Sequence, residues 1–101
     1  MNHDNGLTDE VRTKINGLLQ VLIPGVQVFL YGSRARGTYR AGSDIDLALD
    51  LLEPISQERL NEARSVLDSI RVPYSISLVD LNSISKDFRD AIEKDLIPWQ
   101  N

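Results

Sequence analysis

The residue types most capable of chemistry lie close together in the first half of the chain. Gly32-Ser33 directly follows a short apolar run, and after ten intervening residues come Asp44 and Asp46, two positions apart. In a β-strand, residues i and i+2 project from the same face, about 6.5 Å apart along the chain. The two carboxylates can therefore converge on one side of a sheet, beside a glycine turn with exposed backbone amides. This arrangement predicts a site for a metal-bound polyphosphate.

The loop between the glycine turn and the aspartates is basic. It contains Arg34, Arg36 and Arg40 and no acidic residue, although the whole chain has a formal net charge of -4. A local excess of positive charge in an acidic protein indicates an anionic ligand. We expect Arg36 to neutralise charge on a phosphate, whereas Arg34 and Arg40 could equally be surface charges. The neighbouring Tyr31 and Tyr39 are more typical of packing than of base stacking.

Two aspartates alone would be a weak signal, because such pairs usually lie on a solvated strand edge. Gly32-Ser33 at the right distance changes this interpretation. Mg²⁺ usually takes one or two carboxylates, substrate phosphates and water, so Asp44 and Asp46 fit this cation. The backbone amides of Ser33 and Arg34 can hold the triphosphate, and the Ser33 hydroxyl can add a donor.

Length and composition narrow the class of protein. A chain of 101 residues predicts one domain, spanning residues 1–101. There are no cysteines, which excludes disulfides and thiolate metal sites. No apolar run approaches the roughly 18 residues of a membrane span, and no secretory signal is visible. We therefore expect a cytoplasmic protein without a membrane or direct nucleic-acid partner.

Hydrophobic periodicity predicts an α/β fold with a mixed β-sheet of at least three strands flanked by helices. Thr8 is the expected N-cap of the first helix and Ser85 that of the last. In the last helix we expect Phe88, Ala91, Ile92 and Leu96 to face inward, and Trp99 to cover the core edge or meet a partner. The predicted helices are 7–22, 55–70 (with Pro54 in its first turn) and 86–96, with a helical turn at 33–37; the strands are 26–31, 44–50 and 74–81.

The spacing from Gly32-Ser33 to Asp44-Ile45-Asp46 resembles the G-S-x10-D-x-D motif of the DNA polymerase beta-type nucleotidyltransferase superfamily. Within it, the chain is most similar to the minimal nucleotidyltransferase (MNT) proteins. The likeness extends to residues 78–81 (LVDL) and 87–89 (DFR). It implies a small nucleotidyltransferase fold and transfer of a nucleoside monophosphate, AMP from ATP, to an acceptor hydroxyl with Mg²⁺ as cofactor.

The resemblance also implies a set of site residues. The implied catalytic residues are Asp44, Asp46 and Arg36, and the metal ligands are Asp44 and Asp46. The implied nucleotide-binding residues are Gly32, Ser33, Arg34, Arg36 and Ser43.

One position departs from the family pattern. These enzymes generally use a third acid on a later strand, and Ser77 stands at the position where it is expected. Asp80 lies three residues further on, so strand parity points it to the opposite face, where a local turn bond is the simplest role. A serine is a poor base and a weak metal ligand. The departure predicts nucleotide and Mg²⁺ binding with slow or absent transfer.

The resemblance finally implies a partner. MNT proteins commonly act as antitoxins of HEPN-domain ribonucleases, and some are thought to add AMP to a tyrosine of that toxin. Two functions therefore stay open: an enzyme that modifies a HEPN-domain toxin, or an antitoxin that binds nucleotide and neutralises the toxin by contact. A homodimer and a hetero-oligomer are both compatible with the sequence. A small-molecule nucleotidyltransferase is weaker, because those enzymes generally carry an additional acceptor domain.

Overall fold

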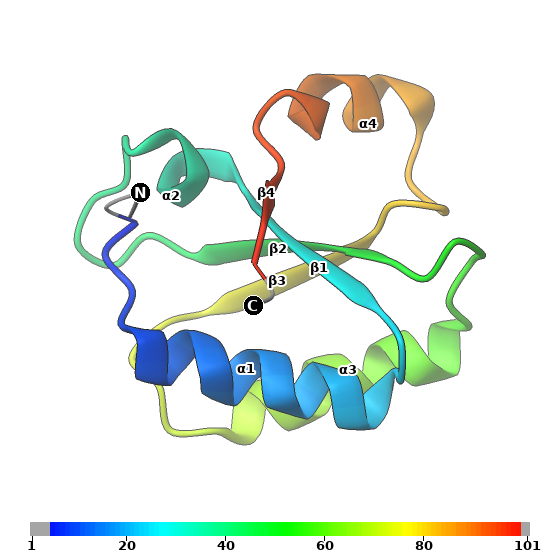
Figure 1. Cartoon of the computed structure of the whole chain (residues 1–101), viewed down its shortest axis with the longest axis horizontal. Coiled ribbons are helices and arrows are strands. Elements are labelled where there is room, and N and C mark those ends of the chain that lie inside the picture. Colours follow the sequence, from blue (N-terminus) through cyan, green and yellow to red (C-terminus); the bar gives the residue numbers. More distant parts are fainter. Residues whose placement is uncertain (1–4, 100–101) are drawn as a thin grey trace.

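The computed structural model of the protein describes residues 5–99 and contains a four-stranded sheet with helices on both faces (Figure 1). The elements are α1 (Asp9–Leu22), β1 (Gln27–Tyr31), α2 (Gly32–Arg36), β2 (Ile45–Asp50), α3 (Gln57–Ser69), β3 (Ile76–Asp80), α4 (Lys86–Glu93) and β4 (Ile97–Pro98). None of the helices within residues 5–99 is long and apolar enough to cross a membrane.

The strand order is β3-β2-β1-β4. The central pair, β1 and β2, is antiparallel, and so is the pair of β1 and β4. Strands β2 and β3 are parallel, and α3 forms the crossover between them. The sheet is therefore mixed, and the predicted α/β class is confirmed.

The two faces of the sheet are covered unequally. Helices α1 and α3 lie side by side against one face (Figure 1), where Ile45, Leu47 and Leu49 of β2 are fully buried in the main core. Helix α4 lies on the other face, over a smaller cluster that includes Ala48 and Ile92. The alternation predicted for the second strand thus holds: one face enters the main core, and the other carries Asp46.

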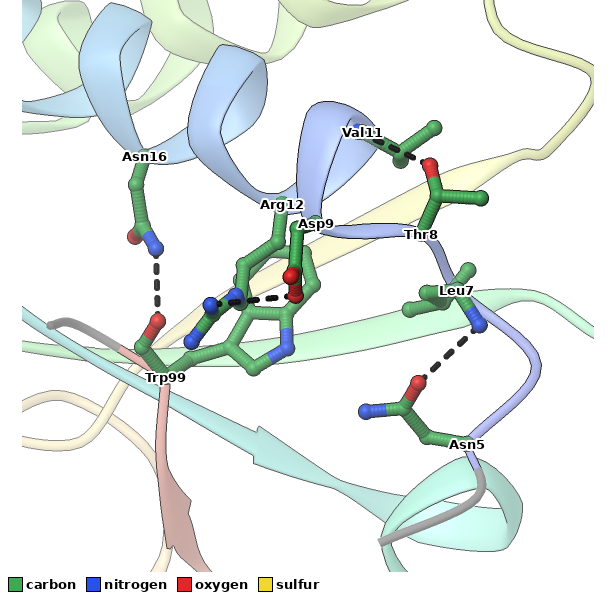
Figure 2. Close-up of polar contacts among 8 residues, drawn as sticks. All are labelled: Asn5, Leu7, Thr8, Asp9, Val11, Arg12, Asn16 and Trp99. Carbon is green, nitrogen blue, oxygen red and sulfur yellow. Dashed lines mark hydrogen bonds and ion pairs between the residues drawn. The ribbon is translucent and has the colours of Figure 1, made fainter. Parts of the chain in front are cut away.

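Local capping explains where the helices begin. The Thr8 hydroxyl accepts from the Val11 amide at 3.2 Å (Figure 2), and Ser85 caps α4 in the same way. Both predicted N-caps are confirmed. Helix α3 starts at Gln57 with Ser56 as its N-cap, so the expected start around Pro54 is wrong. A hydroxyl that satisfies an amide of the first turn stabilises this later start.

The C-terminal prediction is wrong in one respect. The last helix ends at Glu93 instead of near residue 96, and the chain then forms β4, with Ile97 opposite Leu30 of β1. The Trp99 amide donates to the Val28 carbonyl at 2.9 Å, and the Trp99 carbonyl accepts from the Asn16 side chain at 2.7 Å (Figure 2). Trp99 is buried, so it belongs to the core. A strand of two residues is too short to show the alternation of apolar and polar residues by which a strand is predicted from the sequence.

Helix α4 covers its face of the sheet less completely than expected. Ile92 is its buried residue, whereas Ala91 is exposed and Phe88 is 38% exposed. The Phe88 ring meets Tyr31 edge-on, with the ring centroids 6.3 Å apart. The expectation that Phe88 and Ala91 face inward is therefore wrong for Ala91 and only partly met for Phe88.

Candidate active site

One row of side chains crosses the sheet at the end of β1. Tyr31 pairs with Asp46 across the antiparallel strands, and Asp46 pairs with Ser77 across the parallel strands. Residues paired in register project from the same face of a sheet. The three side chains therefore stand next to one another on the face of α4, and Ser77 is the neighbour of Asp46 on β3.

The glycine turn lies directly beneath the Asp46 carboxylate. Gly32 has φ +76°, a conformation that L residues rarely adopt, and a Cβ at this position would overlap Oδ2 of Asp46. Helix α2 begins at this glycine, so the amides of Ser33 and Arg34 belong to its first turn, where no intrahelical acceptor exists. The carboxylate and these backbone amides are thus brought to one place.

The two aspartates influence each other. Asp44 is exposed and precedes β2, which begins at Ile45, and Asp46 is partly buried. Burial raises the pKa of Asp46 above its ordinary value, and the charge of Asp44 raises it further, while Arg36 and Arg34 lower it. The two carboxylates repel each other, and a bound cation would reduce this repulsion.

The oxygen donors suit a magnesium ion that is shared with phosphates. Within residues 5–99 no group of three or more acidic, histidine or cysteine side chains could hold a metal ion by itself. Mg²⁺ seldom uses such an all-protein cage and is usually bound through one or two carboxylates plus substrate phosphates. Asp44 and Asp46 fit this donor set.

Arg34 has a role that the sequence did not reveal. Its side chain is only 3% exposed and its guanidinium lies between the rings of Tyr39 and Tyr74, 4.9 and 4.8 Å from their centroids. Nη2 and Nε donate to the Ser43 carbonyl at 3.0 and 3.3 Å, and Nη1 donates to the Asn5 carbonyl at 2.8 Å. The side chain is therefore engaged inside the protein, and it holds the residue that precedes Asp44. Its backbone amide remains the group available to a phosphate.

The other predicted binding residues lie around this turn. Arg40 is exposed, and its amide donates to the Ser43 hydroxyl at 2.8 Å, while the Ser43 amide donates to the Arg40 carbonyl at 3.0 Å. The Ser43 hydroxyl thus shapes the loop that leads to Asp44. Arg36 is 49% exposed, and its Nη1 donates to Oδ2 of Asp95 at 3.0 Å. The charges of Arg36 and of the buried Arg34 both lower the pKa of Asp46, and of these two arginines Arg36 is the exposed one.

Sequence reasoning missed the connection between Tyr31 and Ser77. Burial and the charge of Asp46 raise the pKa of Tyr31, and a side-chain hydrogen bond with Ser77 acts in the opposite direction. The ordinary pKa of 10.0 is already well above physiological pH and is raised further here, so the hydroxyl of the buried Tyr31 is neutral. The signal for this contact was the register of three strands, which a single sequence does not show.

Asp80 is a structural acid, as predicted. It is 2% exposed and accepts from the Ile55 amide at 2.8 Å, the Asn82 amide at 3.0 Å and the Ser83 hydroxyl at 2.7 Å. Its contact with Ile55 places it toward the main core, away from Asp46. The bonds to residues 82 and 83 are the local turn bonds expected for a strand end.

Comparison with known proteins agrees with this geometry. The family model described as polymerase beta, nucleotidyltransferase matches residues 14–97. The "Probable protein adenylyltransferase MntA" of Haemophilus influenzae is 37% identical over 83 residues, covering 79% of this chain and 70% of the relative.

Solved structures give the same result. A toxin–antitoxin structure with AMP-PNP superposes with a TM-score of 0.75 at 27% identity, over 89% of this chain and 73% of that chain. A mutant of the toxin–antitoxin MntA-HpeT superposes with a TM-score of 0.64 at 31% identity, over 81% of this chain and 63% of the other. The sheet, the glycine turn and the matched residues lead to one conclusion: the chain belongs to the polymerase beta nucleotidyltransferase family.

Proposed function

We propose that this protein is a Mg²⁺-dependent adenylyltransferase that transfers AMP from ATP to a hydroxyl group of a HEPN-domain toxin and acts as its antitoxin. The observation that carries the proposal is the position of the Asp46 carboxylate, directly over the glycine turn at Gly32 and within the influence of Asp44. Similarity to the adenylyltransferase MntA and to toxin–antitoxin structures supports the reaction and the kind of partner.

In this proposal each residue has a defined task. Asp44 and Asp46 hold Mg²⁺, which supplies positive charge to the triphosphate. The amides of Ser33 and Arg34 bind phosphate oxygens, and the Arg36 guanidinium stabilises charge that builds up during transfer. The acceptor oxygen forms a bond to the α-phosphorus, the bond from that phosphorus to the bridging oxygen breaks, and pyrophosphate leaves. The acceptor hydroxyl gives up its proton to solvent water or to the departing pyrophosphate, because no carboxylate of the proposed site is assigned as its base.

The site is open enough for a protein acceptor. Asp44 is exposed, and the Arg36 side chain is 49% exposed, so both reach the solvent-facing side of the site. This exposure supports an acceptor hydroxyl that is supplied by a second protein.

The test combines the protein with ATP, Mg²⁺ and a candidate HEPN-domain partner, followed by intact-mass measurement of both chains. We expect mass increments of AMP on the HEPN-domain protein. Asp46→Asn should abolish them, and Asp68→Asn, an exposed carboxylate of α3 on the opposite side of the sheet, should not. An unmodified partner that is nevertheless neutralised would refute the transfer reaction.

That last outcome describes the second candidate function, an antitoxin that binds nucleotide and neutralises its partner by contact. Ser77 favours it, because a serine stands beside Asp46 where the family resemblance implies an acid. Ser77→Asp should raise the transfer rate, since a carboxylate at this position can take the proton from the attacking hydroxyl group. Ser77→Ala should not raise it. Equal rates for the Asp and Ala variants would show that this position does not limit transfer.

A further inference from the structure

An ion pair joins the basic loop to the C-terminal segment. Nη1 of Arg36 lies 3.0 Å from Oδ2 of Asp95, and the two residues are 59 positions apart. The other ion pairs within residues 5–99 connect neighbours on a single helix, Arg12 with Asp9 and Lys86 with Asp90. The Arg36 pair is therefore the one among them that fixes one element relative to another.

The two side chains of this pair are exposed to different degrees. The Asp95 side chain is 14% exposed, whereas the Arg36 side chain is 49% exposed. The carboxylate is thus the more shielded partner, and the guanidinium is the more exposed one, on the helix that begins at the glycine turn. Partial shielding also makes such a pair stronger than one that is fully solvated.

Both partners are anchored to strand β1. Helix α2, which carries Arg36, begins at the residue that follows β1. Asp95 donates its amide to the Ile92 carbonyl at 2.9 Å and stands two residues before Ile97, which pairs with Leu30 of β1. The backbone positions of the two residues are therefore both set relative to one strand, which keeps their side chains within reach of each other.

The pair leaves most of the guanidinium donors available. An arginine has five N–H donors in a planar fork, and Asp95 takes a bond from Nη1. The remaining edge of the fork can bind a phosphate, a geometry for which guanidinium is well suited. Arg36 does not have to release Asp95 in order to bind a nucleotide.

We propose that Asp95 is a positioning residue that holds the Arg36 guanidinium at the phosphate side of the active site. The inference rests on the proposed function, because it assigns to Arg36 a triphosphate partner. Asp95 acts only through Arg36 and does not touch the substrate. If Asp95 instead competed with the phosphates for Arg36, its removal would raise the affinity for nucleotide. The direction of the change in affinity therefore separates the two roles.

The test is a double-mutant cycle on Mg²⁺-ATP binding, measured by calorimetry. Asp95→Asn should weaken binding about three- to tenfold, the range of a charge-assisted contact that orients a ligand group. In an Arg36→Ala background the same substitution should have no effect, and Asp95→Glu should restore part of the affinity. Asp90→Asn, which removes the 2.7 Å pair with Lys86 on α4, is the matched control and should bind like the wild type.

Each alternative result contradicts the inference in a distinct way. If the wild type binds Mg²⁺-ATP and Asp95→Asn binds it equally well or more tightly, Asp95 does not position Arg36, and the proposed function is unaffected. An equal loss in the Arg36→Ala background would mean that Asp95 acts through the fold instead. A wild-type protein that fails to bind Mg²⁺-ATP would overturn the proposed function and this inference together.

Discussion

Replacing Gly32 with alanine separates the backbone requirement of the turn from its effect on the active site. Gly32 has φ +76° and Gly37 has φ +78°, so an alanine is strained to a similar extent at both positions. A Cβ at Gly37 meets no atom within 4 Å, whereas one at Gly32 overlaps Oδ2 of Asp46. Gly37→Ala is therefore a matched control for Gly32→Ala.

The expected magnitudes follow from these contacts. A left-handed conformation costs an L residue about 1–2 kcal/mol, and the smaller entropy of the unfolded alanine chain offsets about 0.4–1 kcal/mol of this. Each variant should lose about 1 kcal/mol of unfolding free energy. At Gly32 the overlapping atom is the end of a side chain, so Asp46 can rotate away at a further cost of about 0.5–1.5 kcal/mol. Both proteins should fold, but Gly32→Ala should bind Mg²⁺-ATP at least about tenfold more weakly.

Urea denaturation measures the unfolding free energies, and calorimetry measures Mg²⁺-ATP binding at a temperature where both variants are folded. The reasoning is refuted if Gly32→Ala and Gly37→Ala bind Mg²⁺-ATP equally well. That result would mean that the position of the Asp46 carboxylate over the turn has no part in binding.

Three further substitutions test one charged residue of the site, Asp46, and two buried charged residues with structural roles, Arg34 and Asp80. Arg34→Lys should lower the unfolding free energy by about 2–4 kcal/mol in denaturant titrations. A single ammonium group cannot satisfy both carbonyls and both rings, and unpaired buried acceptors cost about 1–3 kcal/mol each. A loss below about 0.5 kcal/mol would contradict this role. Because the pKa of Asp46 is raised in the folded protein, ionisation of this carboxyl destabilises the ligand-free fold as the pH rises from the ordinary pKa of 3.8 through the raised pKa. Asp46→Asn should therefore raise the thermal midpoint near neutral pH and leave it unchanged at a pH below 3.8. A constant difference across that pH range would contradict the shift. Asp80→Ala should lower the unfolding free energy by about 2–4 kcal/mol, since it leaves the buried Ile55 amide and the partly buried Asn82 amide without an acceptor, while the folded protein still binds Mg²⁺-ATP. Loss of Mg²⁺-ATP binding by the folded variant would place Asp80 in the site.

Much of the local structure could be predicted from the sequence, because it depends on contacts between near neighbours. Thr8 and Ser85 cap helices through amides three residues away, and the alternation along β2 separates the core residues from Asp46. The glycine turn followed by a strand with two aspartates is likewise a local pattern. The family motif and the location of the candidate site therefore follow from the order and spacing of residues alone.

The roles of several individual side chains depended on segments that are distant in the sequence. From the sequence Arg34 could be a phosphate ligand or a surface charge, yet it is buried against Tyr39 and Tyr74, whereas Arg36 is half-exposed and pairs with the more shielded Asp95. A loop residue acquires such partners only when separate elements pack together, and no periodicity encodes which elements will meet.

What the sequence by itself determined was the class of fold, the caps and the glycine–aspartate motif, since each arises from spacing along the chain. Only the tertiary structure decided that Ser77 and Tyr31 stand on either side of Asp46, and that Trp99, directly after β4, is buried in the core. The physical reason is that strand register is set by the simultaneous packing of both sheet faces. A shift of one residue would exchange buried and exposed side chains throughout a strand, so the whole fold, and no single segment, selects which residues surround the aspartates.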